Sequence, residues 1–496
     1  MRAACPTRKW AALIGILACL TAPAWAWTLD VEETTLSNGM QVMVVERHHV
    51  PLVSCQLWVK AGSANERPGA TGLAHFHEHL MFKGTQAIGT TDYAAEAALM
   101  ERQDALAERL SAEMGKDVRA DLELIGELRE EILQLEQEQR EYVVPSHLDA
   151  IYADAGADGL NAGTSYDLTM YTVTVPANRL ELWMWLESDR FSSPVFREFY
   201  SERQVIQEER KQTLEDDPMG PYNELLDMVT FPECTYGREI IGTMRDISML
   251  TRSDAYSFFA EHYVPNNMAL VLVGDVEAED VFAMAERYFG RIARVSDPEP
   301  NRSRQRRDIG ERRVRLTAQA QPRVDIRYIT DTFGSPDDAV LDVIGGILSG
   351  ESGRLYKRLV IDEKIALGAS AMAHGRMVSG SFNLSAVPAQ RDGHAAVETV
   401  LVDELRRLAS EPVAAEELEK VKKQARAGLL QMVRGNDMLA TMMGYYWVYT
   451  GDWRELMATV DRIAAVTADD IQEVARRYFV DSNRTVGWLE AEEVAE

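Results

Sequence analysis

The sequence predicts an α+β protein made of two homologous domains, and three observations support this fold class. Strand-like and helix-like segments alternate along the 496 residues, which is typical of helices packed on a sheet. The stretch 293–312 is polar, contains proline and has no periodicity, so it has the composition of a linker. A helix-then-strand segment that starts near residue 250 also recurs 216 positions later.

The repeat is visible within this one chain. LTRSDAYSFFAEHYVPNN at 250–267 aligns with VTADDIQEVARRYFVDSN at 466–483, so that Thr251 matches Thr467. Each Thr is a suitable N-cap and is followed three residues later by an Asp in the first helical turn. Duplication explains the match, and a chance likeness between two helix–strand pairs is the alternative.

These features divide the chain into parts. We expect a signal peptide at 1–26 and an N-terminal domain at 27–292, with a helical insert at about 96–145. The linker at 293–312 then leads to a homologous C-terminal domain at 313–496.

The N-terminus has the pattern of a secretory signal. Three basic residues precede an apolar run at 10–20, and an A-x-A cleavage pattern follows at 24–26. We expect cleavage after Ala26 and a periplasmic or secreted protein, with lipid anchoring at Cys19 as the alternative. No other apolar run reaches the roughly 18 residues that a membrane span needs.

Composition restricts the partners. The chain has 79 acidic and 52 basic residues, and removal of the signal peptide takes the formal net charge from −27 to −30. Nucleic acid and anionic membrane surfaces are therefore disfavoured, because both require a basic footprint. Cys55 and Cys234 remain after cleavage, and they could pair in a disulfide or stay free.

Local patterns predict the main elements in order. Residues 40–59 predict two strands around a turn at 48–51. A short β-rich run at 268–273 predicts another strand, and Ser193 with Pro194 suits the start of a helix. Helical periodicity covers 71–83, 92–142, 180–189, 194–214, 253–263 and 278–289.

The segment 101–141 does not fit the repeat. It carries 13 acids and 6 bases, a net charge of −7. Its apolar residues recur at helical spacing with a break at Gly115, which predicts a hairpin of two amphipathic helices. We interpret it as a solvated insert, with partner docking or substrate steering as the alternative. The apolar positions are Leu106, Leu110, Leu122, Ile125, Leu128, Ile132 and Leu135.

The strongest chemical signal is the run His75-Phe76-His77-Glu78-His79. On a helix, His75 and His79 lie one turn apart on one face and could hold a small cation such as zinc. Glu78 is displaced from that face, where it can reach a metal-bound water without being a ligand. This is the H-x-x-E-H motif of inverzincins. His77 points away, and a His-rich surface turn is the alternative interpretation.

A catalytic zinc site needs three protein ligands and an open position. The acid-rich stretch at 192–211 offers Glu202 and Glu209, which lie seven residues apart and therefore return to the same helical face. Glu208 points about 100° away from Glu209. Without other information, this stretch would also be typical of a solvated helix.

Several segments resemble the pitrilysin/insulinase family of zinc peptidases, and most closely its two-domain subgroup, which includes processing peptidases. They are GLAHFHEHLMFKGT, NAGTSYDLTMYTV, ERQVIQEER, YGREIIGT and HYVPNNMALVLVGDV. The likeness covers most of residues 33–290 and continues more weakly to about 480. It implies two homologous α/β-sandwich-type domains, each a mixed sheet packed by helices, that form half of a clamshell chamber.

The resemblance also implies roles for the motif residues. His75, His79 and Glu209 would hold one Zn²⁺ per chain, and Glu78 would be the catalytic base. Glu202 would not bind the metal itself but would support the residues that do. The insert lengthens the spacing between the two motifs, and removing it restores a separation near the family's value.

A function follows from the same resemblance. The chain is expected to be an exported zinc metalloendopeptidase that hydrolyses peptides or unfolded segments through a zinc-activated water. The strand around Asn161, Ala162 and Thr164 would pair with the peptide substrate by β-augmentation. From the residues alone, Asn161-Ala162-Gly163 would simply be a turn.

One departure from the family affects the second domain. The family carries an Arg and a Tyr that stabilise the transition state, but Val360 and Ala369 stand where they are expected. Either the alignment slips or a homologous chain supplies these groups, so we expect a homo- or heterodimer. The alternatives are the zinc-bearing subunit of a heterodimeric peptidase, a non-catalytic structural subunit, or a scaffold that binds a partner through the helical hairpin.

Overall fold

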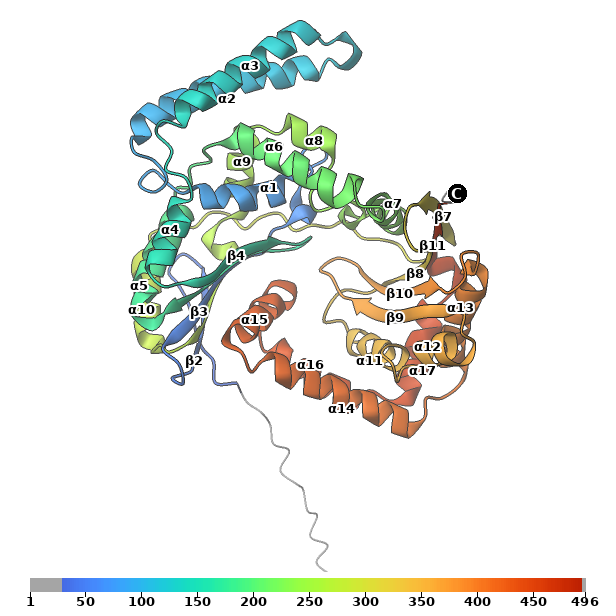
Figure 1. Cartoon of the computed structure of the whole chain (residues 1–496). Coiled ribbons are helices and arrows are strands. Elements are labelled where there is room, and N and C mark those ends of the chain that lie inside the picture. The colour runs from blue at the N-terminus through green and yellow to red at the C-terminus, as the bar shows by residue number, and fades with distance from the viewer. Residues whose placement is uncertain (1–28, 493–496) are drawn as a thin grey trace, which may run out of the picture. The chain divides into compact units, whose positions relative to one another are not determined.

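The computed structural model describes residues 29–492, so the predicted signal peptide, its cleavage site at Ala26 and Cys19 lie outside the described residues. Two mixed β-sheets packed by helices lie in the compact unit that starts at Val31 (Figure 1). This is the predicted α+β fold. None of the helices within residues 29–492 combines the length and the apolar character that crossing a bilayer requires.

The first sheet has six strands in the order β1-β2-β6-β3-β5-β4. β6 is parallel to β2 and antiparallel to β3, and β5 is antiparallel to both β3 and β4. The bounds are β1 Glu32–Thr35, β2 Gln41–Glu46, β3 Leu52–Val59, β4 Asp158–Thr164, β5 Thr169–Pro176 and β6 Met268–Gly274.

The second sheet repeats this arrangement with five strands in the order β7-β11-β8-β10-β9. β11 is parallel to β7 and antiparallel to β8, as β6 is to β2 and β3. The two sheets therefore share one topology, apart from the extra edge strand β1. The bounds are β7 Arg312–Ala318, β8 Arg323–Thr330, β9 Ala366–His374, β10 Gly380–Pro388 and β11 Arg484–Ala491.

The two strands predicted at 40–59 are present as β2 and β3, but they do not pair with each other. β6 lies between them and pairs with both. Every residue of β6 is buried, as expected for a central strand with apolar side chains on both faces. A sequence-distant strand has thus entered between two neighbours in the chain.

Seventeen α-helices are described between residues 29 and 492. Those of the N-terminal half are α1 Leu73–Leu80, α2 Tyr93–Met114, α3 Leu122–Gln139, α4 His147–Asp154, α5 Leu180–Arg190, α6 Phe199–Arg210, α7 Gly220–Thr230, α8 Met244–Met249, α9 Arg252–His262 and α10 Ala278–Tyr288. Those of the C-terminal half are α11 Asp338–Leu348, α12 Arg354–Tyr356, α13 His394–Ser410, α14 Ala415–Met432, α15 Asn436–Thr450, α16 Glu455–Ala465 and α17 Ala468–Tyr478.

The repeated segments have matching caps. Thr251 is the N-cap of α9 and Thr467 is the N-cap of α17, and each forms a capping box with the Asp three residues later. Each helix leads through a short 3-10 turn into a sheet strand, β6 in one case and β11 in the other. The strand partners are equivalent as well, which favours duplication over chance likeness.

The predicted start of helix 194–214 is wrong. α6 begins at Phe199, after Glu198 in the left-handed region (φ 54°). Pro194 instead forms an isolated β-bridge with Thr85, and Val195 N donates to Gly84 O (3.1 Å). A tertiary backbone contact with the loop after α1 therefore uses the residues that look like a helix cap.

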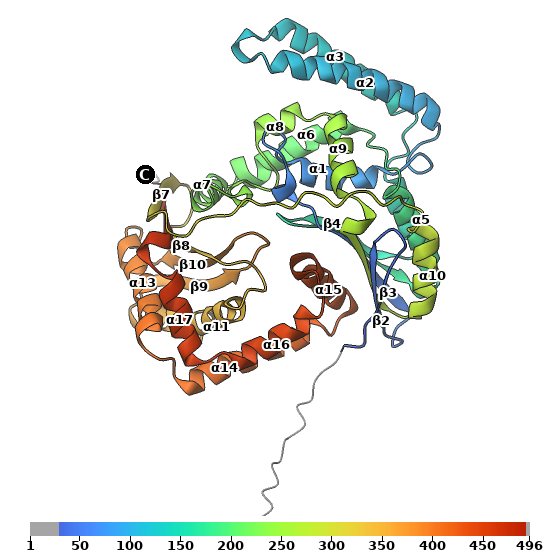
Figure 2. The same cartoon turned by 180° about the vertical axis from the view of Figure 1, so that it is seen from behind.

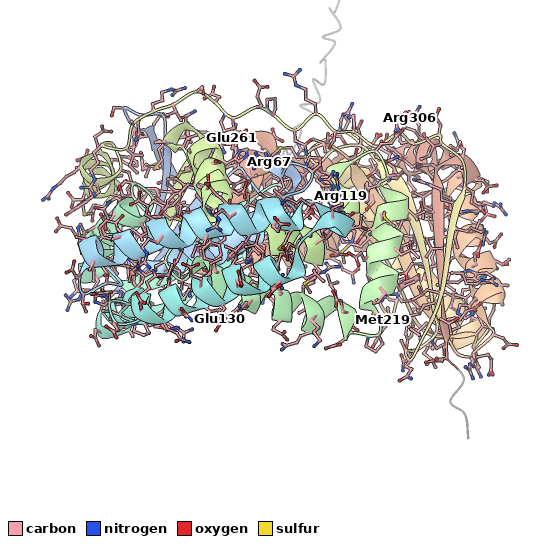
Figure 3. All side chains as sticks on the ribbon, turned by 90° about the horizontal axis from the view of Figure 1, so that it is seen from above. Arg67, Arg119, Glu130, Met219, Glu261 and Arg306 are labelled. Carbon is pink, nitrogen blue, oxygen red and sulfur yellow. The ribbon has the colours of Figure 1, made fainter. Side chains whose placement is uncertain are left out.

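The insert forms the predicted hairpin of α2 and α3, which end and begin on either side of Gly115. Figures 1 and 2 both show it beyond α6, α8 and α9, and Figure 3 shows its helices side by side with Arg119 at the turn. Six of the seven predicted apolar positions are buried. Leu122 is 79% exposed, because it lies in the first turn of α3 at the hairpin tip, where little packs against it.

Two helices cross between the halves. α7 packs on β7 and β11 of the second sheet, whereas α15 packs on β3 and β6 of the first. Tyr222 on α7 donates to Asp325 (2.8 Å), and Gln56 on β3 donates to the backbone oxygen of Asp437 on α15 (3.0 Å). The two helices start 216 residues apart, which is the offset of the repeat.

Cys55 and Cys234 are both free and buried. Cys55 lies on β3, and Cys234 precedes the 3-10 turn Thr235–Gly237. The structure therefore favours two buried thiols over a disulfide.

Candidate metal centre

The helix that carries the histidine motif is held firmly at its N-terminus. Gly72 has a φ of 87°, and a Cβ there would lie 2.2 Å from the Ile241 carbonyl oxygen, so glycine is required. The buried Glu66 carboxylate accepts from Gly72 N (3.0 Å) and Ala74 N (2.8 Å). These contacts satisfy free donors of the first turn of α1. Leu73, Phe76 and Leu80 bury the opposite face in the core.

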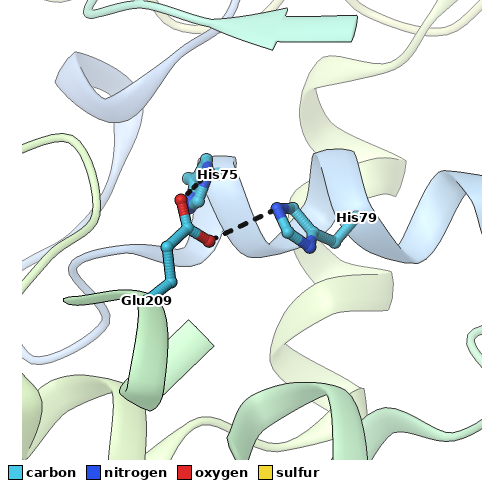
Figure 4. A group of neighbouring side chains, drawn as sticks. All are labelled: His75, His79 and Glu209. Carbon is cyan, nitrogen blue, oxygen red and sulfur yellow. Dashed lines mark ion pairs between the residues drawn. The ribbon is translucent and has the colours of Figure 1, made fainter. Parts of the chain in front are cut away.

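The other face of α1 presents His75 and His79 toward Glu209 of α6 (Figure 4). His75 Nε2 lies 3.6 Å from Glu209 Oε1, and His79 Nε2 lies 3.7 Å from Glu209 Oε2. One donor atom from each of the three residues falls within 4.8 Å of the other two. Across residues 29–492, no other three His, Cys, Asp or Glu side chains gather in this way.

This donor set fits zinc. Four tetrahedral donors at about 2.0–2.2 Å from Zn²⁺ lie roughly 3.4 Å apart, close to the separations of 3.6 and 3.7 Å. Two imidazole nitrogens and a carboxylate are also ligands that zinc accepts, and three of them leave one position open.

Glu202 orients one of the imidazoles. Its Oε1 lies 3.0 Å from His79 Nδ1, which leaves His79 Nε2 directed at Glu209. Lys83 Nζ lies 2.6 Å from Glu202 Oε2. Burial alone would raise the pKa of Glu202, but the His79 hydrogen bond and the Lys83 charge lower it to about 2. Glu202 is thus an anion that holds the His79 ring in place.

The two imidazoles differ electrostatically. Burial, with a smaller effect from His79, lowers the pKa of His75 to about 4, so that His75 is neutral near pH 7. Burial also acts to lower the pKa of His79, but the hydrogen bond and charge of Glu202 outweigh it and raise that pKa.

Glu78 lies beside the cluster and contacts the first sheet. The Thr164 hydroxyl donates to Glu78 Oε2 (2.6 Å). Burial raises the pKa of Glu78, and the Thr164 hydrogen bond and the His79 charge offset part of that rise. Its carboxylate lines a cavity of about 390 Å³ together with His79, Phe82, Asn161 and Ala162.

The three residues expected to meet a substrate all lie on β4. Asn161, Ala162 and Thr164 pair with β5, and β4 is the outermost strand of its sheet. The structure therefore brings Thr164 to Glu78 and places Asn161 and Ala162 on the cavity wall. The outer edge of β4 has no partner strand among the described residues, so this edge remains open to an extended peptide.

His77 points away from the metal face, as the helical spacing predicts. It is fully buried, with its ring 4.4 Å from that of Tyr263 and 5.0 Å from that of Phe196. It therefore packs in the core rather than in the cluster.

The two residues that stand where the resemblance leads us to expect the family's Arg and Tyr lie in the second domain. Val360 falls in the π-helical turn Lys357–Asp362, and Ala369 lies on β9. Two arginines that precede Val360 in the chain are paired within their own domain, Arg354 with Glu417 (2.6 Å) and Arg358 with Asp403 (2.5 Å).

Two contributors were missed from the sequence. Lys83 ends the 3-10 turn Met81–Lys83 that continues the motif helix, four residues after His79, and pairs with Glu202; this spacing was an available signal. Glu66 had no such signal, because its partners are backbone N–H groups of a left-handed glycine turn.

Comparison with known families gives two matches. The model described as "Insulinase (Peptidase family M16)" matches residues 41–107, which include the histidine motif. The model described as "Peptidase M16 inactive domain" matches residues 249–425.

Individual proteins are similar over most of the chain. "Zinc protease PqqE" of Helicobacter pylori is 24% identical over 477 residues, covering 92% of each chain. The crystal structure of a protease from Helicobacter pylori has a TM-score of 0.77 at 23% identity, covering 93% of this chain and all of the other. The periplasmic protease PqqL of Escherichia coli has a TM-score of 0.70 at 18% identity, covering 92% of this chain and 47% of PqqL. These structures share the fold of this chain.

Proposed function

Because the chain belongs to the insulinase family, peptidase family M16, we propose that it is an exported zinc metalloendopeptidase. It would hydrolyse peptide bonds in peptides or unfolded segments. The observation that carries the proposal is the convergence of His75, His79 and Glu209 beside Glu78, next to an open strand edge.

His75, His79 and Glu209 would hold one Zn²⁺ per chain, and Glu202 would keep the His79 ring in position. Bound zinc would supply Lewis-acid chemistry, polarising the scissile carbonyl and lowering the pKa of a water.

Glu78 is the general base in this proposal. It would take a proton from the attacking water and pass it to the leaving amine. The Thr164 hydroxyl holds one carboxylate oxygen, which leaves the other oxygen to accept the proton. His79 lines the same cavity, so the carboxylate lies next to the metal-binding face.

The substrate would bind as an added strand on β4. Asn161 and Ala162 line the same cavity as Glu78. Pairing there would hold the peptide extended beside the carboxylate, with backbone hydrogen bonds that do not depend on the substrate's sequence. This recognition suits peptides and unfolded segments.

A second candidate is the zinc-bearing subunit of a heterodimeric peptidase. Val360 and Ala369 stand where the family has its Arg and Tyr, and Arg354 and Arg358 are occupied by acids of their own domain. The chain covers 47% of PqqL, whose length therefore accommodates two such units. A homologous chain would supply the missing groups. A non-catalytic structural subunit is a weaker candidate, because all four motif residues are present.

The test compares Glu78→Gln with the unchanged chain. Loaded with zinc, the unchanged chain should cleave an unstructured peptide. Glu78→Gln should bind one zinc per chain but cleave about 10²–10⁴-fold more slowly, since it lacks the general base.

A matched pair on α6 tests the third ligand. Glu209→Gln should weaken zinc binding, measured by competition with a chelator, whereas the exposed neighbour Glu208→Gln should leave it unchanged. Equal cleavage by Glu78→Gln and the unchanged chain would contradict the mechanism, and equal zinc affinity of the two α6 variants would contradict the ligand assignment.

A further inference from the structure

The tip of the β4–β5 hairpin, residues 165–168, is seated on the first domain directly beside Thr164. Ser63 N donates to Ser165 O (3.1 Å), and Ala64 N donates to Tyr166 O (2.8 Å). A Cβ on Gly62 would lie 2.2 Å from Ser165 O, so the two backbones touch at that point. Because Thr164 immediately precedes this tip, its hydroxyl can reach Glu78 only while the tip keeps its place.

A buried carboxylate, Asp167, links the same tip to both domains. Asp167 is 3% exposed and accepts from the hydroxyl of Tyr236, a residue of the first domain, at both oxygens (2.8 and 2.9 Å). Met377 N, in the turn between β9 and β10, also donates to Asp167 (3.3 Å), and Val378 N donates to the Tyr236 oxygen (3.0 Å). β9 ends and β10 begins at this turn; Figures 1 and 2 show the two strands across from β4.

Arg376, in the same β9–β10 turn, also contacts the hairpin tip. Its guanidinium lies 4.3 Å from the ring centre of Tyr166, 5.0 Å from that of Tyr236 and 5.4 Å from that of Phe231. Cation–π contacts of this kind strengthen when they are shielded from water. Arg376 therefore clamps the tip residue Tyr166 against the first domain.

We propose that Asp167 and Arg376 are positioning residues, through which the second domain holds Thr164 in hydrogen-bonding position against Glu78. They act through the hairpin tip rather than by touching the reacting atoms. The proposal rests on the proposed function, because it assigns Glu78 its role in proton transfer. It also gives the second domain a part in the reaction that does not require the family's Arg and Tyr.

The geometry separates this contact from an ordinary domain contact. Arg454 also joins the two halves, with its guanidinium 2.6 Å from Glu33, but that pair lies at β1, at the opposite edge of the sheet from β4. Loss of the Arg454 pair should loosen the domains without moving the hairpin tip. Arg454→Gln is therefore the matched control.

The experiment is a double-mutant cycle on peptide turnover with the zinc-loaded full chain. Asp167→Asn, Arg376→Met and Thr164→Val should each lower kcat roughly tenfold, the effect of losing one hydrogen bond to a charged group. KM should change less than kcat. The double variant Thr164→Val/Asp167→Asn should be no slower than the slower single variant, because both changes remove the same contact.

Thr164→Ser keeps the hydroxyl and should restore kcat, and Arg454→Gln should leave it unchanged. If kcat of Thr164→Val/Asp167→Asn is about 100-fold below that of the unchanged chain, the two losses multiply and the proposal is overturned. An unchanged kcat in both Asp167→Asn and Arg376→Met would overturn it as well.

Amide hydrogen exchange keeps the inference separate from the proposed function. If neither the zinc-loaded unchanged chain nor Glu78→Gln cleaves any peptide, the proposed function fails. The positioning contact is then judged by exchange in residues 158–169, which should speed up in Asp167→Asn and Arg376→Met but not in Arg454→Gln. Unaltered exchange in the first two variants would count against the contact itself.

Discussion

The imidazole of His79 is held at both nitrogens, by Glu202 on one side and toward Glu209 on the other. Neither acid is near His79 in the sequence, and both come from α6. The seven-residue spacing of Glu202 and Glu209 puts them on one helical face, so a single helix serves both nitrogens. Lys83 pairs with Glu202 and balances its negative charge. The two carboxylates of Glu202 and Glu209 therefore do not leave an uncompensated double negative charge next to His79.

Buried histidines outside the cluster make a prediction about acid stability. His262 ends α9 with a 3% exposed side chain, and its Nδ1 has no hydrogen-bond partner among the described residues. Burial lowers its pKa, so the folded protein keeps it neutral. As pH falls below the unfolded value of about 6.5, the unfolded chain takes up the proton and the folded chain does not, so stability is lost.

We therefore expect His262→Phe to lose less stability than the unchanged chain between pH 7 and pH 5. One proton accounts for up to about 1.4 kcal/mol per pH unit in the free energy of unfolding. Urea unfolding of the metal-free proteins measures the difference, and exposed His49→Gln should behave like the unchanged chain. Parallel losses in His262→Phe and His49→Gln would show that His262 does not titrate in this way.

Helices α7 and α15 show how the elements bind the halves together. Each covers the sheet of the other half, and their starts differ by the offset of the repeat. The contact of α15 is close, because a Cβ on Gly444 would lie 2.1 Å from the buried Trp58 ring. Glycine at this position lets the helix reach the sheet.

A substitution on α15 tests this contact. Gly444→Ala should destabilise the protein by about 1–3 kcal/mol, because the added methyl group would overlap the buried Trp58 indole. Gly428→Ala on α14 is the control, since nothing lies within 4 Å of its added Cβ, and it should gain up to about 1 kcal/mol from helix propensity. Thermal unfolding compares the two, and a Gly444→Ala variant as stable as Gly428→Ala would contradict the packing of α15.

Local signals predicted elements better than their partners. The capping boxes at Thr251 and Thr467 and the hairpin of α2 and α3 follow from short-range patterns. The start of α6 does not follow from such a pattern. The residues that suit a helix cap form a β-bridge with the loop after α1 instead. Leu122 follows the helical pattern but lies where the hairpin has no further neighbour to bury it.

For the whole molecule, the open question is whether one chain is enough for full activity. The proposed zinc ligands and Glu78 lie in the first domain, whereas the resemblance to the family places Val360 and Ala369 where its Arg and Tyr are expected. We expect the purified chain to bind zinc and cleave peptides slowly. Adding a homologous chain that carries the Arg and Tyr should raise kcat about 10²–10³-fold, the effect of a transition-state donor.

Turnover measured with and without the second chain, together with light scattering for the assembly, checks this prediction. A second chain whose Arg has been changed to Met is the control, and it should assemble without raising kcat. Full turnover by the single chain would mean that no such donor is needed from outside. The clamshell chamber implied by the family also stays a prediction that this measurement of assembly would address.

The sequence by itself determined what depends on neighbouring residues. Helical spacing put His75 and His79 on one face of α1, and it put Glu202 and Glu209 on one face of α6, because side-chain direction in a helix repeats every 3.6 residues. Only the tertiary structure decided which faces meet. It placed α6 against α1 and β6 between β2 and β3. It also placed the tip of the β4–β5 hairpin, with Asp167, in contact with the second domain. These contacts join segments that are more than 100 residues apart, and burial of two whole surfaces selects them rather than any local pattern.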